Sequence, residues 1–129
     1  MVEPQVDNIS AAIADLYGEK NEGGMLCCTL ETVNGDGVDI SIQVMAESIN
    51  LTPYPFAEDP LTHLEVSGAM ETLDHLQLDL VDWDANAFAT IGTSGNDPAD
   101  IARLIHRTFV KVLRCPKDYA VKVSTEDLS

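Results

Sequence analysis

The residues best suited to covalent chemistry are three cysteines, namely Cys27, Cys28 and Cys115. A nucleophilic cysteine needs a base and an orienting group within hydrogen-bond reach, and the sequence around these residues carries no such signature. A structural zinc site needs ligand pairs spaced as in Cys-x2-Cys, which this set lacks. Because the number is odd and two of the cysteines are neighbours, we expect buried free thiols and no disulfide. On a strand, Cys27 and Cys28 would point to opposite faces, one of them into the core.

The segment closest to a metal-binding loop is Asp82-Trp83-Asp84-Ala85-Asn86. It places oxygens at the first, third and fifth positions of a calcium loop. The sixth position, however, is Ala87 where that loop needs glycine, and the twelfth is Thr93 where it needs a bidentate glutamate. We therefore interpret the segment as a hairpin loop.

The histidines and glycines give no stronger site. His63, His75 and His106 have no mutual spacing typical of a metal site. Gly92-Thr93-Ser94-Gly95 is too short for a phosphate-binding loop of the Walker or dinucleotide type. The sequence therefore predicts no enzyme activity, no metal and no cofactor, and a small enzyme of unknown reaction is the last of the alternatives.

The elements that position these residues begin with a short helix and a β-hairpin. Asp7-Asn8 offers an N-cap, apolar residues then recur at helical spacing, and Gly18 offers a stop. Residues 25–33 and 38–46 have the pattern of two strands joined by the turn 34–37. In the second strand polar residues alternate with an apolar set that predicts one buried face: Val38, Ile40, Ile42 and Val44.

The middle of the chain is predicted less uniformly. Residues 48–51 indicate a third strand, which the prolines of 52–56 end. Residues 61–73 fit a helix or a strand, and we favour a helix although Gly68 weakens it by about 1 kcal/mol. Residues 76–80 and 87–91 predict a second hairpin.

The last helix has the clearest signals. Asp97 is a suitable N-cap, Pro98 fits the first helical position and Asp100 lies in the first turn. One face is apolar and comprises Ile101, Leu104, Ile105, Thr108, Phe109 and Val112. Cys115-Pro116 ends the helix. Residues 117–123 then indicate a terminal strand, and the tail from about residue 124 is expected to fray.

Together these elements predict a single α+β domain over residues 1–129. Its antiparallel sheet has four to six strands and is flanked by an N-terminal and a long C-terminal helix. Uncharged stretches are far shorter than the ~20 apolar residues of a membrane span. The N-terminus, Met1-Val2-Glu3-Pro4, opens with an acid where a secretory signal has bases, so we expect a cytoplasmic protein.

Charge is sorted along the chain, whose net charge is −15. Residues 1–102 contain nineteen acids and one base, whereas residues 103–122 contain six bases and one acid. An acidic body repels phosphate backbones and anionic membranes, so we expect neither nucleic acid nor a membrane as partner. A protein or peptide, and a basic one above all, is the natural complement.

Two features are candidates for binding such a partner. The first is a basic stripe on the last helix, opposite its apolar face: Arg103, Arg107, Lys111 and Arg114. This stripe is a solvated face, a docking surface for the acidic body of the same chain or of a twin subunit, or a nucleic-acid contact. A twin subunit would make a homodimer. The second feature is Tyr54 with Phe56, two aromatic residues held open by prolines, which either cap the core or contact a partner.

A family resemblance rests on two parts of the chain. The first is the pair of strands expected at residues 24–33 and 38–50, and the second is the segment 87–91 that leads into residues 97–105. In this pattern the chain resembles the type III secretion chaperone-like fold and its relatives, the bacterial sensory-transduction-regulator proteins and the peptide-binding chaperone domains of actinobacteria. The resemblance implies an acidic, non-enzymatic, often dimeric cytosolic protein that holds an extended segment of a partner. The basic last helix departs from that pattern.

The alternative class is an acidic decoy, whose carboxylates imitate DNA phosphates and occupy a basic nucleic-acid-binding protein. A decoy needs its acids arrayed on one surface. A chaperone-like module needs an exposed apolar patch or groove.

Overall fold

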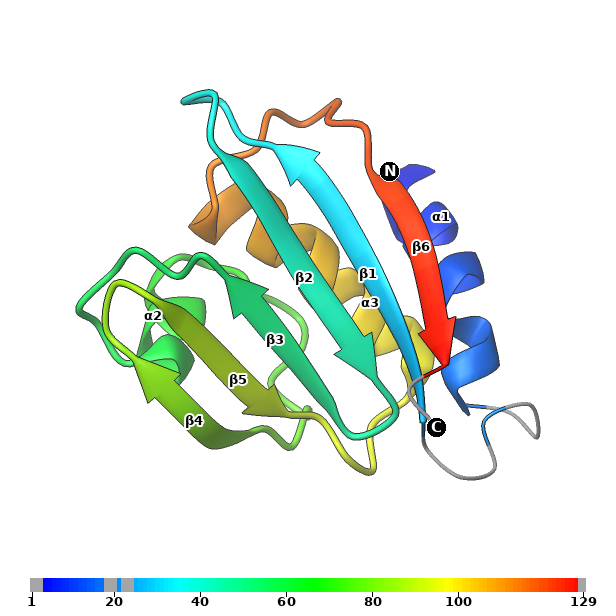
Figure 1. Cartoon of the computed structure of the whole chain (residues 1–129). Coiled ribbons are helices and arrows are strands. Elements are labelled where there is room, and N and C mark those ends of the chain that lie inside the picture. Colours follow the sequence, from blue (N-terminus) through cyan, green and yellow to red (C-terminus); the bar gives the residue numbers. More distant parts are fainter. Residues whose placement is uncertain (1–3, 18–20, 22–24, 128–129) are drawn as a thin grey trace.

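The computed structural model describes residues 4–17, 21 and 25–127 of the chain, and Figure 1 shows one sheet with helices behind it. The elements in chain order are α1 (Pro4–Ile13), the 3₁₀ turn η1 (Ala14–Tyr17), β1 (Leu26–Val33), β2 (Asp39–Met45), β3 (Ser48–Thr52), α2 (Pro60–Val66), β4 (Asp79–Asp84), β5 (Phe88–Gly92), α3 (Pro98–Arg107), the π-helical turn η3 (Thr108–Val112) and β6 (Lys122–Asp127). The fold is α+β, as the sequence predicts.

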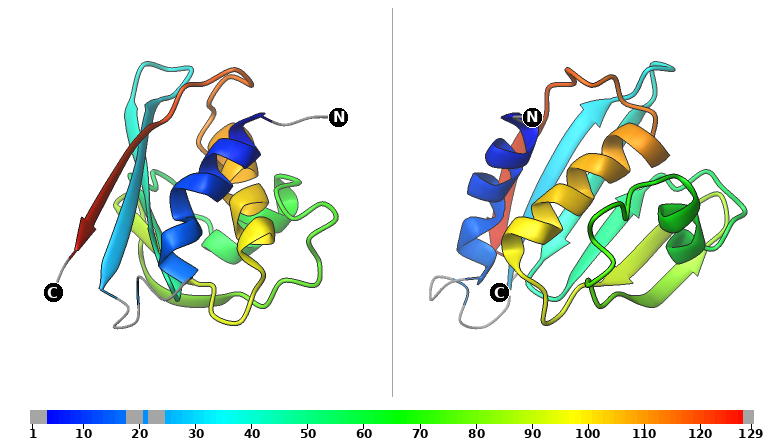
Figure 2. Two further views of the ribbon diagram at one scale, coloured as in Figure 1. Left: turned by 90° about the vertical axis from the view of Figure 1, so that its right-hand side faces the viewer. Right: turned by 180° about the vertical axis from the view of Figure 1, so that it is seen from behind.

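The sheet has six strands in the order β4-β5-β3-β2-β1-β6, and each neighbouring pair is antiparallel. Figure 2 shows α1, α2 and α3 on one side of it. No helix of the described residues covers the other side, which we call the open face and which faces the viewer in Figure 1. The core therefore lies in a single layer between sheet and helices.

The β1–β2 hairpin is confirmed, and its turn explains why. The side-chain oxygen of Asn34 accepts hydrogen bonds from the backbone N–H groups of Asp36 (2.9 Å) and Val38 (3.0 Å), and Gly37 takes a φ of +79°. The alternation of β2 holds for residues 40, 42 and 44, which are buried. Val38 is 45% exposed instead, because it lies in the turn before β2 begins.

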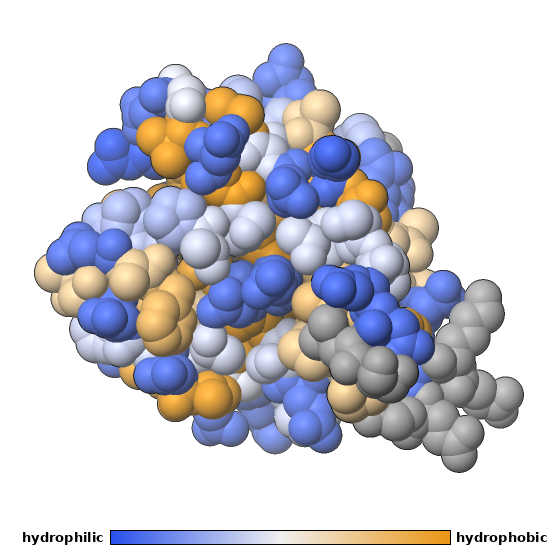
Figure 3. Space-filling view, in the orientation of Figure 1, coloured by the Kyte–Doolittle hydropathy of each residue, from blue (hydrophilic) through white to orange (hydrophobic). Residues whose placement is uncertain are grey.

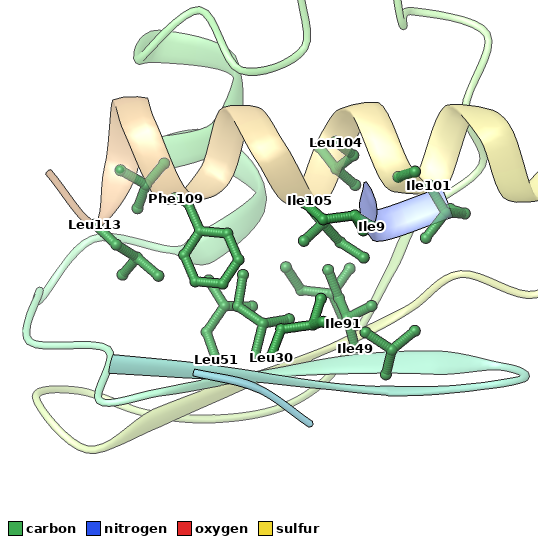
Figure 4. Close-up of a cluster of buried hydrophobic side chains, with 14 of the residues drawn as sticks. Ile9, Leu30, Ile49, Leu51, Ile91, Ile101, Leu104, Ile105, Phe109 and Leu113 are labelled. Atoms are coloured by element: carbon green, nitrogen blue, oxygen red, sulfur yellow. The ribbon is translucent and has the colours of Figure 1, made fainter. Parts of the chain in front are cut away.

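The start and the apolar face of the last helix are also confirmed, although the α-helix ends at Arg107 and continues as a π-helical turn only to Val112, before the predicted stop at Cys115-Pro116. The Asp97 carboxylate accepts from the backbone N–H of Ala99 at 2.9 Å, and Pro98 opens α3. All six residues of the predicted apolar face are buried. Figure 4 shows this face lying over the sheet, with Phe109 pointing toward Leu51 and Leu30.

The helices at the start and middle of the chain differ from the prediction. α1 begins at Pro4, earlier than the expected cap at residues 7–8, since proline is well accepted in a first turn. The expected stop at Gly18 lies outside the described residues. Residues 60–66 form α2, capped by the Asp59 carboxylate, but Gly68 (φ +86°) follows the C-cap Ser67, and residues 67–72 form turns. A helix over the whole of 61–73 was thus too long a prediction.

Two strand boundaries are corrections as well. β4 begins at Asp79, so Leu76 and Leu78 precede the strand. The terminal strand covers residues 122–127 instead of 117–123. Its register runs from Lys122 opposite Glu31 to Asp127 opposite Leu26, so residues 124–127, expected to fray, are paired with β1.

Candidate functional site

Two of the predicted binding residues, Phe56 and Arg114, lie at one pocket of about 270 Å³. It lies between the β1–β2 turn, the segment after β3 and the residues that follow η3, and we call it the hairpin pocket. Its walls are largely apolar and comprise Asn34, Asp36, Val38, Ile40, Pro53, Pro55, Phe56, Leu113 and Arg114. In Figure 3, hydrophobic residues (orange) gather at the upper left, over the tip of the β1–β2 hairpin.

The segment 53–56 is held in place by the β4–β5 turn. Tyr54 donates its backbone N–H to the Ala87 carbonyl at 3.1 Å, and the Phe56 carbonyl accepts from Asn86 at 3.4 Å. Because Tyr54 points inward, the prolines on either side of it face the pocket. This wall is therefore fixed by backbone contacts and by proline geometry.

Tyr54 itself is a core residue. Its side chain is only 1% exposed, which favours the interpretation that it caps the core over direct contact with a partner. Its hydroxyl donates to the Glu58 carbonyl at 2.9 Å, which leaves His63 Nδ1, at 3.0 Å, to donate to the hydroxyl oxygen. Burial raises the pKa of Tyr54 to about 12. The half-buried Phe56 ring packs edge-on against Tyr54 and His63, at centroid distances of 5.1 and 4.6 Å.

The opposite wall depends on the end of the last helix. Arg114 has a φ of +66°, and the Cys115 N–H donates to the Phe109 carbonyl at 2.9 Å, which is one residue further back than in a Schellman motif because the preceding turn is π-helical. The Gly35 N–H donates to the Arg114 carbonyl at 2.9 Å, and a Cβ on Gly35 would lie 3.0 Å from that oxygen. A side chain at position 35 would therefore crowd the contact between the hairpin turn and the helix end.

A charged pair stands at the pocket rim. The Arg114 guanidinium lies 3.8 Å from the Asp36 carboxylate, and the two side chains are 69% and 61% exposed. Such an exposed, long contact contributes little to stability. Both groups are therefore accessible to a ligand.

The rest of the basic stripe contacts its own chain. Arg107 donates to the Glu71 carbonyl and, at 3.3 Å, to the Thr72 hydroxyl. Lys111 lies beside Gly68, where an added Cβ would be 3.5 Å from its Nζ. Of the three interpretations of the stripe, these contacts favour docking on the same chain, and only Arg114 joins Phe56 at the pocket.

Arg103 belongs to a separate charged cluster. Its guanidinium lies 2.7 Å from the Asp100 carboxylate, whose other oxygen is 2.8 Å from His75 Nε2. The hydrogen bond from His75, followed by the charges of His75 and Arg103, lowers the pKa of Asp100. The cluster fixes the first turn of α3 against the loop before β4.

We expect Asp100→Asn to remove a pH-dependent part of the stability. A lowered folded-state pKa stabilises the protein above the ordinary carboxyl pKa, and this contribution disappears as the pH falls through the folded value. The difference in unfolding free energy between wild type and variant should therefore be larger at pH 7 than at pH 3. Urea unfolding at both pH values measures it, and NMR titration of Asp100 at an ordinary carboxyl pKa would contradict it.

The open face is the second candidate surface. Its middle is polar: Asn50 donates to the Thr52 hydroxyl at 2.9 Å and accepts from the Thr90 hydroxyl at 2.8 Å. Strand register places one base, Lys122, and six acids on this face: Glu31, Asp39, Asp79, Asp82, Asp84 and Glu126. Figure 3 shows this side as mainly hydrophilic.

The three cysteines are placed where free thiols are unreactive. All three cysteines are free and buried, and burial raises the pKa of each thiol, that of Cys115 to about 11, so the reactive thiolate is disfavoured. Across residues 4–17, 21 and 25–127, no three His, Cys, Asp or Glu side chains are grouped so as to hold a metal ion. None of the described helices has the length and apolar character needed to cross a membrane.

Sequence reasoning missed five residues of the pocket, namely Asn34, Asp36, Val38, Ile40 and Leu113. Val38 was assigned to the core, although its position next to Gly37 places it in the turn. Leu113 falls at the margin of the apolar face, beside the helix stop, which is the signal that could have found it.

Comparisons of the chain with protein-family models, with curated proteins and with solved structures give no match. The order of elements that prompts the resemblance, one helix, three strands, a helix, a hairpin and a helix, is present, with β6 added after it. The function must therefore be inferred from the pocket and the surface charges.

Proposed function

We propose that the protein is a non-enzymatic, chaperone-like module that binds a segment of a protein partner, with an apolar side chain of that segment in the hairpin pocket. The observation that carries the proposal is the apolar wall of Pro53, Pro55 and Phe56 facing Leu113 and Val38. These residues leave an apolar concavity open at the surface, where a partner can bury an anchor residue.

The size of the pocket supports a side chain as its occupant. Sites for small molecules and cofactors usually measure about 300–1,000 Å³, and the hairpin pocket measures about 270 Å³. Its walls are already ordered by backbone hydrogen bonds and prolines. Little conformational entropy is then lost when an anchor enters.

The charge of the protein indicates a basic partner segment. A body of net charge −15 attracts cations over long distances. Asp36 at the rim can pair with a base next to the anchor, while Arg114 rejects a second base on its own side. The chaperone-like resemblance supports the same role, in the cytoplasm and in a homodimer.

Val38→Glu is the variant that tests the pocket. The partner is first trapped by a photo-crosslinking residue at position 36, and its affinity is then measured by calorimetry. A carboxylate in the apolar wall should weaken binding by about tenfold or more, which corresponds to ~1.4 kcal/mol. Val66→Glu is the matched control, because Val66 is 75% exposed on α2 and lines none of the pocket. Equal loss of binding in both variants, or in neither, would refute the pocket.

The acidic decoy is the second candidate function, and the acids of the open face favour it. Neutralising three of them on one edge, in Asp79→Asn/Asp82→Asn/Asp84→Asn, should then abolish binding to a basic nucleic-acid-binding protein. Under the chaperone-like proposal the same triple variant keeps its partner and Val38→Glu loses it. The two variants therefore separate the two functions.

A further inference from the structure

β6 is an outermost strand of the sheet, and it is exposed to an unusual degree. It pairs with β1 on one side, and no described strand pairs with its other edge. All six of its residues are exposed, including Val123 at 44%. The left panel of Figure 2 shows the strand (red) along the outer side of the sheet, with α1 (blue) beside it on the helix side.

The other edge of the sheet differs in the features that prevent strand pairing. β4 carries Asp79, Asp82 and Asp84 and has an irregular register between Leu80 and Asp82. Charged side chains, proline and bulges are the usual protection of an edge strand. β6 is charged as well, at Lys122, Glu126 and Asp127, but its charges are of both signs. β6 contains no proline, and it keeps six consecutive pairs with β1 without a register shift. Its outer edge is thus a regular template for a further strand.

The charges of β6 are complementary to those of a second β6. Lys122 and Glu126 both lie on the open face, opposite Glu31 and Cys27 respectively. Four residues along a strand separate them by about 13 Å, so they cannot pair within one copy. In an antiparallel strand of a second copy, the order of the two charges is reversed.

We propose that two copies of this chain associate through β6, which pairs antiparallel with itself about a two-fold axis at Ser124. With such an axis both open faces lie on one side of a continuous sheet. Even-numbered residues of one β6 then lie opposite even-numbered residues of the other, and odd-numbered residues opposite odd-numbered ones. Lys122 then lies opposite Glu126 of the second copy, and Val123 lies opposite Thr125. Registers centred on Val123 or Thr125 place no acid of β6 opposite Lys122.

Directly opposed residues on neighbouring strands have Cβ atoms about 4.5–5.5 Å apart, within reach of an ion pair. The symmetry makes two such pairs for each dimer. In each, Lys122 is placed between Glu31 of its own copy and Glu126 of the other. The interface uses neither the hairpin pocket nor the basic stripe, so its test is independent of the test of the pocket.

Charge reversal tests this interface. Sedimentation velocity over a range of concentrations should show a dimer for the wild type. Lys122→Glu and Glu126→Lys should each weaken association by about tenfold or more, because like charges then face each other twice. Lys111→Glu, the same change on a base of η3 away from β6, should leave the dimer unchanged.

Mixing the two single variants distinguishes the interface from loss of structure. A heterodimer of Lys122→Glu with Glu126→Lys regains two opposite-charge pairs, so the mixture should dimerise although neither variant does so alone. The double variant Lys122→Glu/Glu126→Lys should also dimerise. A wild type that is monomeric throughout, single variants that dimerise normally, or a mixture that stays monomeric would overturn the proposal.

Discussion

Tyr54→Ala is expected to lower the free energy of unfolding by about 3–5 kcal/mol, as for other large buried aromatic residues. The side chain is 1% exposed and packs against Phe56 and His63, and its hydroxyl donates to the Glu58 carbonyl. Truncation leaves a cavity beside the pocket wall and an unpaired carbonyl. Urea unfolding monitored by circular dichroism measures the loss, and the melting temperature should fall by about 10 °C or more.

Two further variants separate packing from binding. Tyr54→Phe removes only the hydroxyl, so we expect a loss of about 0.5–1.5 kcal/mol, the usual contribution of one hydrogen bond. Phe56→Ala should weaken partner binding while lowering stability less than Tyr54→Ala, because Phe56 is half-buried and lines the pocket. If Tyr54→Ala kept its stability and lost its partner instead, Tyr54 would be the binding residue that the sequence first suggested.

The parts of the fold that could be predicted have their signals within a few residues. The turn of the first hairpin is specified by Asn34 and Gly37, and the start of α3 by Asp97-Pro98. Periodicity then identified which side of each element is buried. The same local signals failed for Gly68, which was treated as a weak point inside a helix and in fact ends it, since its φ of +86° suits a C-terminal residue.

β6 could not be predicted at its true position because its sequence is polar on both faces. Residues 122–127 have no apolar alternation to mark a strand. They become one because β1, which is far away in the chain, offers an unpaired edge to a segment that follows the last helix. The pairing is a tertiary effect, which propensity does not encode.

Only one wall of the hairpin pocket could be predicted from the sequence, for a similar reason. Three segments distant in the chain form it, and they meet at the contact between Gly35 and the Arg114 carbonyl. Proline-flanked aromatic residues indicated one wall. The sequence could not decide that Tyr54 turns inward and Phe56 toward the pocket, because both orientations suit such a segment.

Several bases of the C-terminal part of the chain lie beside acids or carbonyl groups of the same chain, as Arg103 does with Asp100 and Arg107 with the Glu71 carbonyl. Arg107 and Lys111 lie against the 68–72 segment on the helix side, whereas six acids and one base lie on the open face. Arg107 and Lys111 are thus in contact with their own chain, whereas the open face carries an excess of acids. Two copies joined at β6 would present both open faces on one side, so a basic partner could contact both at once.

Phe109→Ala is expected to lower the free energy of unfolding by about 3–5 kcal/mol. Unlike a change elsewhere in the core, it should also weaken the binding of a partner in the hairpin pocket. The ring is fully buried, lies 5.2 Å from Tyr119 and points toward Leu51 and Leu30 in Figure 4. The carbonyl of the same residue receives the Cys115 N–H, which closes the turn that carries Leu113 and Arg114.

Phe109→Leu is the matched control, since it retains an apolar side chain and should lose less than about 1.5 kcal/mol if the site repacks. Partner affinity is compared at a temperature where all three proteins are folded, as judged by circular dichroism. We expect Phe109→Ala to bind more weakly than Phe109→Leu, because a loosened helix end no longer holds Leu113 against Phe56 across the pocket. Equal affinities would mean that the partner's anchor residue contacts only the hairpin and the prolines, and that the helix end contributes to the core but not to binding.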